Sequence, residues 1–523
     1  MLVHFFESFP NGWDQAEYAW CVQSGYLPHS PYIFFFLAGS FFHLFLDSAA
    51  ALSFLSVLSG LLCIVLFYLI QLRLFSSGTE RKAPVPSGRA MAASSSILMG
   101  LSYVFIRQAS TQEVYAFQTL LLLLSIFILL VRLEHGAIYS GVVYGCAVAA
   151  HSASLFLFPA MAYAVLAFAP SRLRSRDSRV RSLLIWFSAV GVTCGSFCLL
   201  IYLILPAAHQ AELLAYLRGI SSSPPFESWS SGRFWTRSIR GLFVRLSSLS
   251  VPESRGPLAT SPLGLSLFHL LAAGLGMVLC LRLETRQGVF WLLYLAPYTL
   301  YELLLGMNLD YGIYLPLVLP PLWSFTAFAV LATFKGRESC RLPSLSIALR
   351  SAVLLSLLAP SAFLIVRHWS DPERDAVAHY TPATLGAIWM SRNLPQDALV
   401  IQSSKEWNGN LLPYYSRRPH VLRNGPLLLF VDRGKFTPMN RGSYQPLTTA
   451  FLRSVIASGR PVYAFEREPL GGRRLDLLDP GAFEWEVAAS PSLDSVQPLL
   501  PVPESVRSRL LRGVIVIYRA RVR

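Results

Sequence analysis

Charged residues are scarce in this chain of 523 residues. They make up 14% of it, whereas about a quarter of a typical soluble domain is charged. Hydrophobic residues account for 54%, and the mean hydropathy is +0.48. This composition excludes an ordinary soluble globular protein, so we predict an integral membrane protein.

Hydrophobic alternation is also missing. Residues 120–131 read LLLLLSIFILLV, whereas a strand of a lipid-facing barrel alternates apolar and polar residues. The other apolar residues also gather in blocks close to the roughly 20 residues that a membrane-spanning helix needs. The sequence therefore predicts a mainly α fold, a polytopic transmembrane helical bundle.

Cysteine is sparse and has no metal-binding or redox pattern. None of the seven cysteines forms a CxxC pair or a zinc-type spacing. Those inside apolar blocks are expected to pack as small hydrophobes; they are Cys63, Cys146, Cys194, Cys198 and Cys280.

About ten spans are expected. They are 50–72, 92–106, 117–132, 137–150, 152–169, 183–206, 263–282, 288–306, 311–333 and 346–366. Several are short, so a neighbouring pair could merge. Residues 32–46 are expected to form a helix lying in the outer interface.

The net charge of +15 follows this topology and does not indicate a nucleic-acid partner. Every second connector is basic, and by the positive-inside rule these connectors face the cytoplasm. They contain Arg73, Arg81, Lys82, Arg89, Arg132, Arg172, Arg174, Arg176, Arg179, Arg181, Arg282, Arg286, Lys335, Arg337 and Arg341. Residues 1–49 contain no Lys or Arg, so they are expected outside.

Two domains are predicted. The first, 1–366, is the membrane domain, with an outer loop and interfacial helix in 1–49 and a long outer loop at 207–262. The second, 367–523, is an extracytoplasmic α/β domain, in which the apolar run ALVIQ at 398–402 predicts a strand. It could select acceptors or act as a structural cap. No full span precedes the polar stretch at 11–20, so either the chain begins outside or a further helix lies upstream of Met1.

The long outer loop contains an amphipathic basic segment. Arg233, Arg237, Arg240 and Arg245 alternate there with aromatic and aliphatic residues. The segment could rest on the outer leaflet or line a groove for an anionic lipid head group, and the first interpretation is favoured two to one.

Ionisable and polar residues gather at the predicted outer side. They are Asp14, Glu17, His29, Arg107, Glu113, His151, Asp310 and Tyr314. Placing such groups at or near the hydrocarbon region costs free energy, so they are candidates for function. The alternatives remain open: Asp14 and Glu17 as ordinary loop acids, Arg107 and Glu113 as a surface pair, and His151 as a structural turn residue.

Four motifs resemble the GT-C glycosyltransferases that use polyprenyl-phosphate sugars, in particular the bacterial protein O-mannosyltransferase-like branch. The most specific is FIRQASTQEVYAF at 105–117, which is similar to the family pattern W-R-Q-A-x-x-x-E-V-Y-A-L. GCAVAAHSAS at 145–154 resembles G-L-A-x-x-N-H-P-T. The other two place Asp14, Glu17, His29 and Pro31, and then Asp310, Tyr314 and Pro316, at family positions.

The resemblance implies transfer of a sugar, with mannose as one candidate, from a polyprenyl-phosphate carrier to a hydroxyl of a protein or glycan acceptor, with inversion. Asp14 and Glu17 would be catalytic. Arg107, Gln108 and His151 would bind the donor phosphate. Residues in positioning or metal-binding roles would be Glu113, Tyr115, His29, Asp310 and Tyr314. Such oxygen-rich ligands would suit Mg²⁺ or Mn²⁺. A bacterial plasma membrane is the implied location.

Two other functions compete with this one. A transporter or flippase would need polar groups along a path through the bilayer, and the apolar blocks carry few. A non-catalytic scaffold is supported by Trp13 and Ala16, which replace family glycines beside Asp14.

Overall fold

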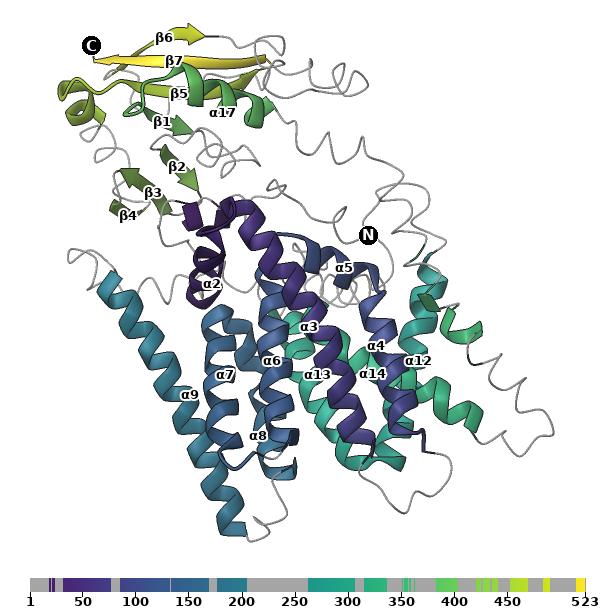
Figure 1. The fold of residues 1–523 in the computed structure, drawn as a ribbon. Helices are drawn as coiled ribbons and strands as arrows, with labels where there is room; N and C mark the ends of the chain where they lie inside the picture. Colours follow the sequence, from purple (N-terminus) through teal and green to yellow (C-terminus); the bar gives the residue numbers. More distant parts are fainter. Residues whose placement is uncertain are drawn as a thin grey trace.

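The structure, a computed structural model, describes part of the chain in two regions, a helical bundle and a β-sheet (Figure 1). The described residues are 18–19, 21–23, 32–76, 85–131, 133–168, 176–204, 262–305, 315–335, 350, 352–355, 357–358, 362, 382–402, 420–424, 427–432, 435–440, 452–468, 483–489 and 514–522.

The bundle consists of apolar helices. In chain order they are α2 (Ile33–His43), α3 (Ser48–Ser76), α4 (Gly88–Gly100), α5 (Tyr103–Ser110), α6 (Val114–Val131), α7 (Gly136–Ala150), the 3₁₀-helix η2 (Ser152–Leu157), α8 (Phe158–Phe168), α9 (Arg176–Ile204), α12 (Pro262–Leu283), α13 (Thr285–Leu305) and α14 (Leu315–Lys335). The predicted mainly α membrane bundle is confirmed. Within the described residues, α3, α6 and 177–203 of α9 are each long and apolar enough to cross a membrane alone.

One expected span differs from the prediction. The segment 92–106 is not a single helix, because the chain bends by 64° between α4 and α5. Ser102 is extended at this point, and its hydroxyl donates to the carbonyl of Met99, 2.9 Å away. The bend turns α5 across the end of the bundle (Figure 1).

Small residues allow the helices to approach closely, as is usual in membrane bundles. A Cβ on Gly60 of α3 would lie 2.5 Å from the Cβ of Ala109 on α5. A Cβ on Gly276 of α12 would lie 1.8 Å from the carbonyl oxygen of Phe325 on α14. Both positions therefore exclude any larger side chain unless a helix backbone moves.

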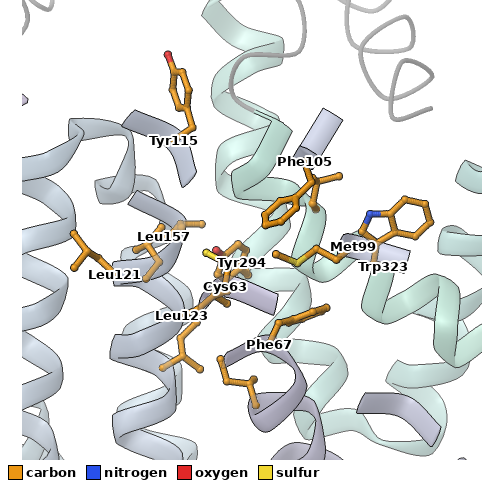
Figure 2. Close-up of a cluster of buried hydrophobic side chains, with 14 of the residues drawn as sticks. Cys63, Phe67, Met99, Phe105, Tyr115, Leu121, Leu123, Leu157, Tyr294 and Trp323 are labelled. Carbon is orange, nitrogen blue, oxygen red and sulfur yellow. The ribbon is translucent and has the colours of Figure 1, made fainter. Parts of the chain in front are cut away.

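The interior between these helices is filled by aromatic and aliphatic side chains. Figure 2 shows Cys63 and Phe67 of α3 meeting Tyr294 of α13, with Met99 and Trp323 beside them. All five are buried. Free cysteine thus packs as a small hydrophobe at position 63, as the sequence predicted.

One end of the bundle gathers basic residues of α3, α12 and α13, and we call it the basic end. The side-chain amide of Gln287, at the start of α13, donates to the carbonyl of Leu74 in the last turn of α3, 2.9 Å away. The guanidinium of the neighbouring Arg286 lies 4.5 Å above the ring of Phe168, the last residue of α8. Arg73 and Arg282 occupy the last turns of α3 and α12. The contacts at Leu74 and Phe168 bring together the ends of three of the basic connectors that the charge pattern groups on one side.

The C-terminal region contains a seven-stranded mixed sheet. Its strands are β1 (Leu399–Gln402), β2 (His420–Asn424), β3 (Leu427–Asp432), β4 (Lys435–Asn440), β5 (Val462–Glu468), β6 (Phe483–Ala489) and β7 (Val514–Val522), in the order β4-β3-β2-β1-β5-β7-β6. The central strand β1 pairs parallel with β2 and β5, and the remaining pairs are antiparallel. The strand predicted at 398–402 is confirmed as β1.

A helix covers the centre of this sheet. α17 (Pro382–Asn393) buries Ala387 and Met390 against Val400 of β1, Tyr463 of β5 and Ile517 of β7. The described part of 367–523 is therefore an α/β layer, as predicted. In Figure 1 the sheet lies beyond the end of the bundle that carries α5.

Candidate active site

Half of the predicted site residues fall within the described structure. Arg107 and Gln108 lie on α5, Glu113 and Tyr115 lie at the start of α6, and His151 joins α7 to η2. The other five, Asp14, Glu17, His29, Asp310 and Tyr314, lie outside the described residues. The end of the bundle that carries α5 and His151 is called the site end below.

A row of small polar residues on α3 holds the link between α5 and α6. The hydroxyl of Ser56 donates to the carbonyl of Glu113 at 3.0 Å, and the Gln112 amide donates to the Ser53 hydroxyl at 2.8 Å. Ser53, Ser56, Gly60 and Cys63 recur every three or four residues, so they share one face of α3. This face fixes the backbone on which Glu113 stands.

α5 presents two candidate phosphate ligands in different environments. The side chain of Arg107 is exposed, whereas Gln108 is buried. Successive residues of a helix point about 100° apart, so one can reach into the surroundings while its neighbour packs against α3 or α14. Arg107 is therefore free to turn towards a ligand at the site end.

His151 terminates one helix and starts another. Its backbone leaves the helical conformation after α7, and its Nδ1 accepts a hydrogen bond from the backbone N–H of Ala153, 3.1 Å away, at the start of η2. This is the position that an N-cap side chain occupies. The turn predicted at His151 therefore has a physical basis. The imidazole accepts the hydrogen bond of the Ala153 N–H, which has no backbone acceptor at the start of η2.

Burial determines the charge of His151. The side chain is 5% exposed, and desolvation lowers its pKa from 6.5 to about 3. The imidazole is consequently neutral near pH 7. Because Nδ1 accepts a hydrogen bond, the single ring proton of the neutral form belongs on Nε2. His151 is thus a neutral donor through Nε2, which makes it unsuited to acting as a cationic acid in this state.

A buried polar network fixes the backbone around His151. The side-chain amide of Gln118, on α6, donates to the hydroxyl of Ser154 at 2.8 Å and reaches the carbonyl of His151 at 3.4 Å. Ser154 in turn donates to the carbonyl of Ala147, and the hydroxyl of Tyr144 donates to the carbonyl of Ser154 at 2.6 Å. The helix break is therefore specified by side chains from α6 and α7.

Two tyrosine rings contact the imidazole. The ring of Tyr32, just before α2, is stacked on His151 with centroids 4.8 Å apart and planes 17° apart. The ring of Tyr115 lies 5.4 Å away and is tilted by 47°. Figure 2 shows Tyr115 set apart from the hydrophobic cluster, with its hydroxyl pointing away from it. The structure thus brings the rings of Tyr115 and His151 into contact, although the two residues are 36 positions apart in the sequence.

A divalent-metal site is not formed by the described residues. Among them, no group of three or more His, Cys, Asp or Glu side chains lies close enough to hold an ion. The acids that the resemblance implies as ligands lie mostly in undescribed segments.

Sequence reasoning missed several residues that shape this site. Tyr32 resembles an ordinary interfacial aromatic, and Gln118 lies one residue beyond the motif at 105–117. Ser53 and Ser56 lie within an apolar span. Their spacing along α3 places them on one face of the helix, but it does not show which segment they bond to.

A family model matches an N-terminal segment of the chain that contains the described site residues. Residues 14–172 match the family model of the protein O-mannosyl-transferase TMEM260 N-terminal domain. The matched segment begins at Asp14 and includes Arg107, Glu113 and His151, whereas Asp310 and Tyr314 lie outside it. A search by sequence among curated proteins gives no match.

Solved structures support the same fold. The crystal structure of ArnT from Cupriavidus metallidurans bound to undecaprenyl phosphate superposes with a TM-score of 0.60 at 12% identity, covering 99% of this chain and 96% of that one. The same protein in the apo state gives a TM-score of 0.56 at 13% identity, with the same coverage. The chain thus has the fold of ArnT, and the predicted resemblance to protein O-mannosyltransferases is confirmed over residues 14–172.

Proposed function

We propose that this protein transfers a sugar from a polyprenyl-phosphate carrier to a hydroxyl acceptor. The observation that carries the proposal is the arrangement at the site end, where a buried neutral histidine is held as an Nε2 donor beside the start of α6. It occurs within the segment that matches a protein O-mannosyl-transferase domain, on a fold whose solved relative binds undecaprenyl phosphate.

The site end is suited to an anionic phosphate. α6 starts at Val114, so its N-terminus lies next to the contacting rings of Tyr115 and His151. Helix N-termini carry unpaired N–H groups and a partial positive charge, which favour phosphate. Arg107 would add a full positive charge and two parallel hydrogen bonds to the phosphate. The leaving phosphate would therefore be stabilised by groups fixed before the reaction.

The proposed reaction is one displacement at the anomeric carbon. Asp14 takes the proton of the acceptor hydroxyl as its oxygen forms the new glycosidic bond. The bond between the anomeric carbon and the phosphate oxygen breaks, and its electron pair leaves with polyprenyl phosphate. Arg107, Gln108 and His151 hold that phosphate. Glu17, Glu113 and Tyr115 position the reacting groups, with His29, Asp310 and Tyr314 completing the site.

We further infer that the site end faces away from the cytoplasm. The basic end, where Gln287 meets Leu74 and Arg286 lies over Phe168, carries the positive charges that favour a cytoplasmic position. The site end is at the opposite end of α3. The sheet of the C-terminal region would then be extracytoplasmic, where it can meet a protein or glycan acceptor. A bacterial plasma membrane is the proposed location.

The test is release of polyprenyl phosphate by the purified protein in nanodiscs. A panel of polyprenyl-phosphate sugars, beginning with mannose, is supplied together with serine- and threonine-containing peptides. Wild type is expected to release the carrier and glycosylate a peptide. Asp14→Asn and Arg107→Ala are each expected to reduce release at least 100-fold, because one removes the base and the other the phosphate ligand.

Matched controls separate chemistry from folding. Asp47→Asn makes the same change at the start of α3, where the Asp47 carboxylate accepts from the N–H of Ala49 and Asn can replace it. Arg89→Ala removes an exposed arginine at the start of α4. Both controls should retain activity. No release with any donor by folded protein, or equal loss in the controls, contradicts the proposal; movement of intact donor across the bilayer would support a flippase instead.

A further inference from the structure

A stack of aromatic rings joins the N-terminal segment to His151. Tyr32 lies face to face with the imidazole, and the ring of Tyr18 meets Tyr32 edge-on, with centroids 5.8 Å apart and planes 77° apart. Tyr18 is 1% exposed and also packs edge-on against Phe35 and Phe36 of α2. The stack therefore connects the residue next to Glu17 with the turn at His151.

The geometry of Tyr32 is unusual among the aromatic contacts of the bundle. Its planes with His151 differ by only 17°, whereas the neighbouring pairs Tyr18–Tyr32 and Phe42–Phe54 are close to perpendicular, at 77° and 66°. A face-on neighbour restricts rotation of the imidazole about χ2, because turning the ring would drive its edge into the tyrosine. An edge-on neighbour imposes a weaker restriction.

Restricting that rotation has a chemical consequence. The hydrogen bond from Ala153 N–H to Nδ1 requires one orientation of the ring, and the tautomer with the proton on Nε2 depends on this bond. Tyr115 contacts the same ring at 5.4 Å from α6. Rings from two separate elements therefore hold the imidazole in the orientation that directs its N–H donor.

We propose that Tyr32 is a positioning residue that fixes the orientation and tautomer of His151, and that Tyr18 braces Tyr32 against α2. The consequence for catalysis rests on the proposed function, in which His151 holds the phosphate. The statement about tautomer does not depend on it. Tyr32 acts through its ring, so its hydroxyl is dispensable for this role.

The first measurement reads the tautomer directly. ¹⁵N-histidine-labelled protein in nanodiscs is studied by NMR, and the His151 signals are assigned by their loss in His151→Asn. Wild type should show one tautomer, with the proton on Nε2. Tyr32→Leu should show a mixture of tautomers, while Tyr32→Phe, which keeps the ring, should match wild type. Phe42→Leu is the control, because it removes a ring contact of α2 with Phe54 and leaves His151 untouched.

The second measurement is steady-state transfer with a polyprenyl-phosphate sugar. Tyr32→Leu should lower kcat by about 10- to 100-fold, the loss expected when a catalytic group is misplaced by about 1 Å. The KM for the donor should change much less. Tyr32→Phe and Phe42→Leu should retain the wild-type kcat. A merely structural tyrosine would instead reduce the yield of folded protein and leave the kcat of that protein unchanged.

The outcomes separate the two proposals. If Tyr32→Leu folds and keeps both the single tautomer and the wild-type kcat, Tyr32 is not a positioning residue, whatever the protein catalyses. If Tyr32→Leu fails to fold, Tyr32→Met, which keeps an extended apolar side chain but no ring, tests the same point and should again alter the tautomer ratio. If wild type transfers no sugar while Tyr32→Leu mixes the tautomers, the proposed function fails and the positioning of His151 stands.

Discussion

The helices α3 and α9 have the same length, 29 residues, and both are strongly apolar, but they differ in how much protein surrounds them. Half of the most apolar stretch of α3 is buried inside the protein, compared with 17% of that of α9. Ser53 and Ser56 of α3 bond to another segment, with Ser56 donating to the carbonyl of Glu113. Thr193 and Ser196 of α9 bond to their own helix one turn back.

The difference shows that hydropathy identifies a membrane helix but does not show which faces are in contact with protein. On α3, Gly60 marks a close crossing, whereas a Cβ on Gly191 or Gly195 of α9 would meet nothing within 4 Å. A glycine or serine in an apolar span therefore indicates a helix contact only when its neighbours in space are known. Substitutions at packed positions should therefore have larger effects than matched substitutions at lipid-facing positions.

The largest effect is expected at Gly276. Replacing it with Ala would place a Cβ against the carbonyl of Phe325, so α12 and α14 must separate, at a cost of about 3 kcal/mol or more. Gly274→Ala, on the same helix, meets nothing within 4 Å and should be neutral. Thermal unfolding in detergent compares the two. Equal Tm values for both variants would contradict the close crossing of α12 and α14.

A somewhat smaller loss is expected for Gly60→Ala. The new methyl group would push α5 from α3 at Ala109, at a cost of about 1–3 kcal/mol. Because α5 carries Arg107 and Gln108, we expect transfer activity to fall as well. Gly195→Ala should leave both stability and activity unchanged, or raise stability slightly through helix propensity. If Gly60→Ala retains wild-type activity and Tm, α5 is not held by α3.

The pH dependence of stability should reveal the burial of His151. Its pKa is about 3 in the folded protein and about 6.5 when unfolded. The unfolded chain therefore binds a proton between these values and the folded chain does not, so the free energy of unfolding falls as pH decreases from 6.5 towards 3. At pH 5 the loss is about 2 kcal/mol. Tm measured against pH should decrease less steeply in His151→Asn; identical slopes would argue against a buried neutral imidazole.

The smallest effect is expected for single hydroxyl groups. Ser56→Ala removes the hydrogen bond to the Glu113 carbonyl and should cost about 1 kcal/mol. Ser196→Ala on α9 removes only a bond to its own helix and should be neutral. Hydrogen exchange at the amides of residues 111–114 gives a local measurement. Faster exchange in Ser56→Ala alone is the expected result, and unchanged exchange would contradict a docking role for α3.

Many of the membrane helices were predictable, because the length of an apolar run can be read directly from the local sequence. Segments such as 50–72 and 183–206 became α3 and α9, with ends that shift by two to seven residues. The bend between α4 and α5 was not predicted, because residues 101–102 carry no proline and the break depends on packing against α3. The strand at 398–402 was predictable from its apolar run, whereas the order of the seven strands depends on pairings between distant segments.

The candidate site was predicted in part. Motif spacing singled out Arg107, Glu113 and His151, and the structure supplies a reason for His151, because its ring caps η2. The contact of Tyr32 with His151 spans 119 positions, and no local pattern could reveal it. The roles of all the predicted site residues stay predictions, and Asp14, Glu17, His29, Asp310 and Tyr314 also lie outside the described structure.

The bond from Gln287 to the carbonyl of Leu74 also has a consequence for biosynthesis. The two residues are 213 positions apart, and at roughly 5–20 residues per second a ribosome needs on the order of 10–40 s to make the chain between them. During that interval the carbonyl of Leu74, at the end of α3, lacks its hydrogen bond from Gln287. The N-terminal helices can assemble early through the nearer contacts of Ser53 and Ser56, and α13 closes the bundle late. A stalled or truncated chain would therefore expose the last turn of α3 to quality-control proteases.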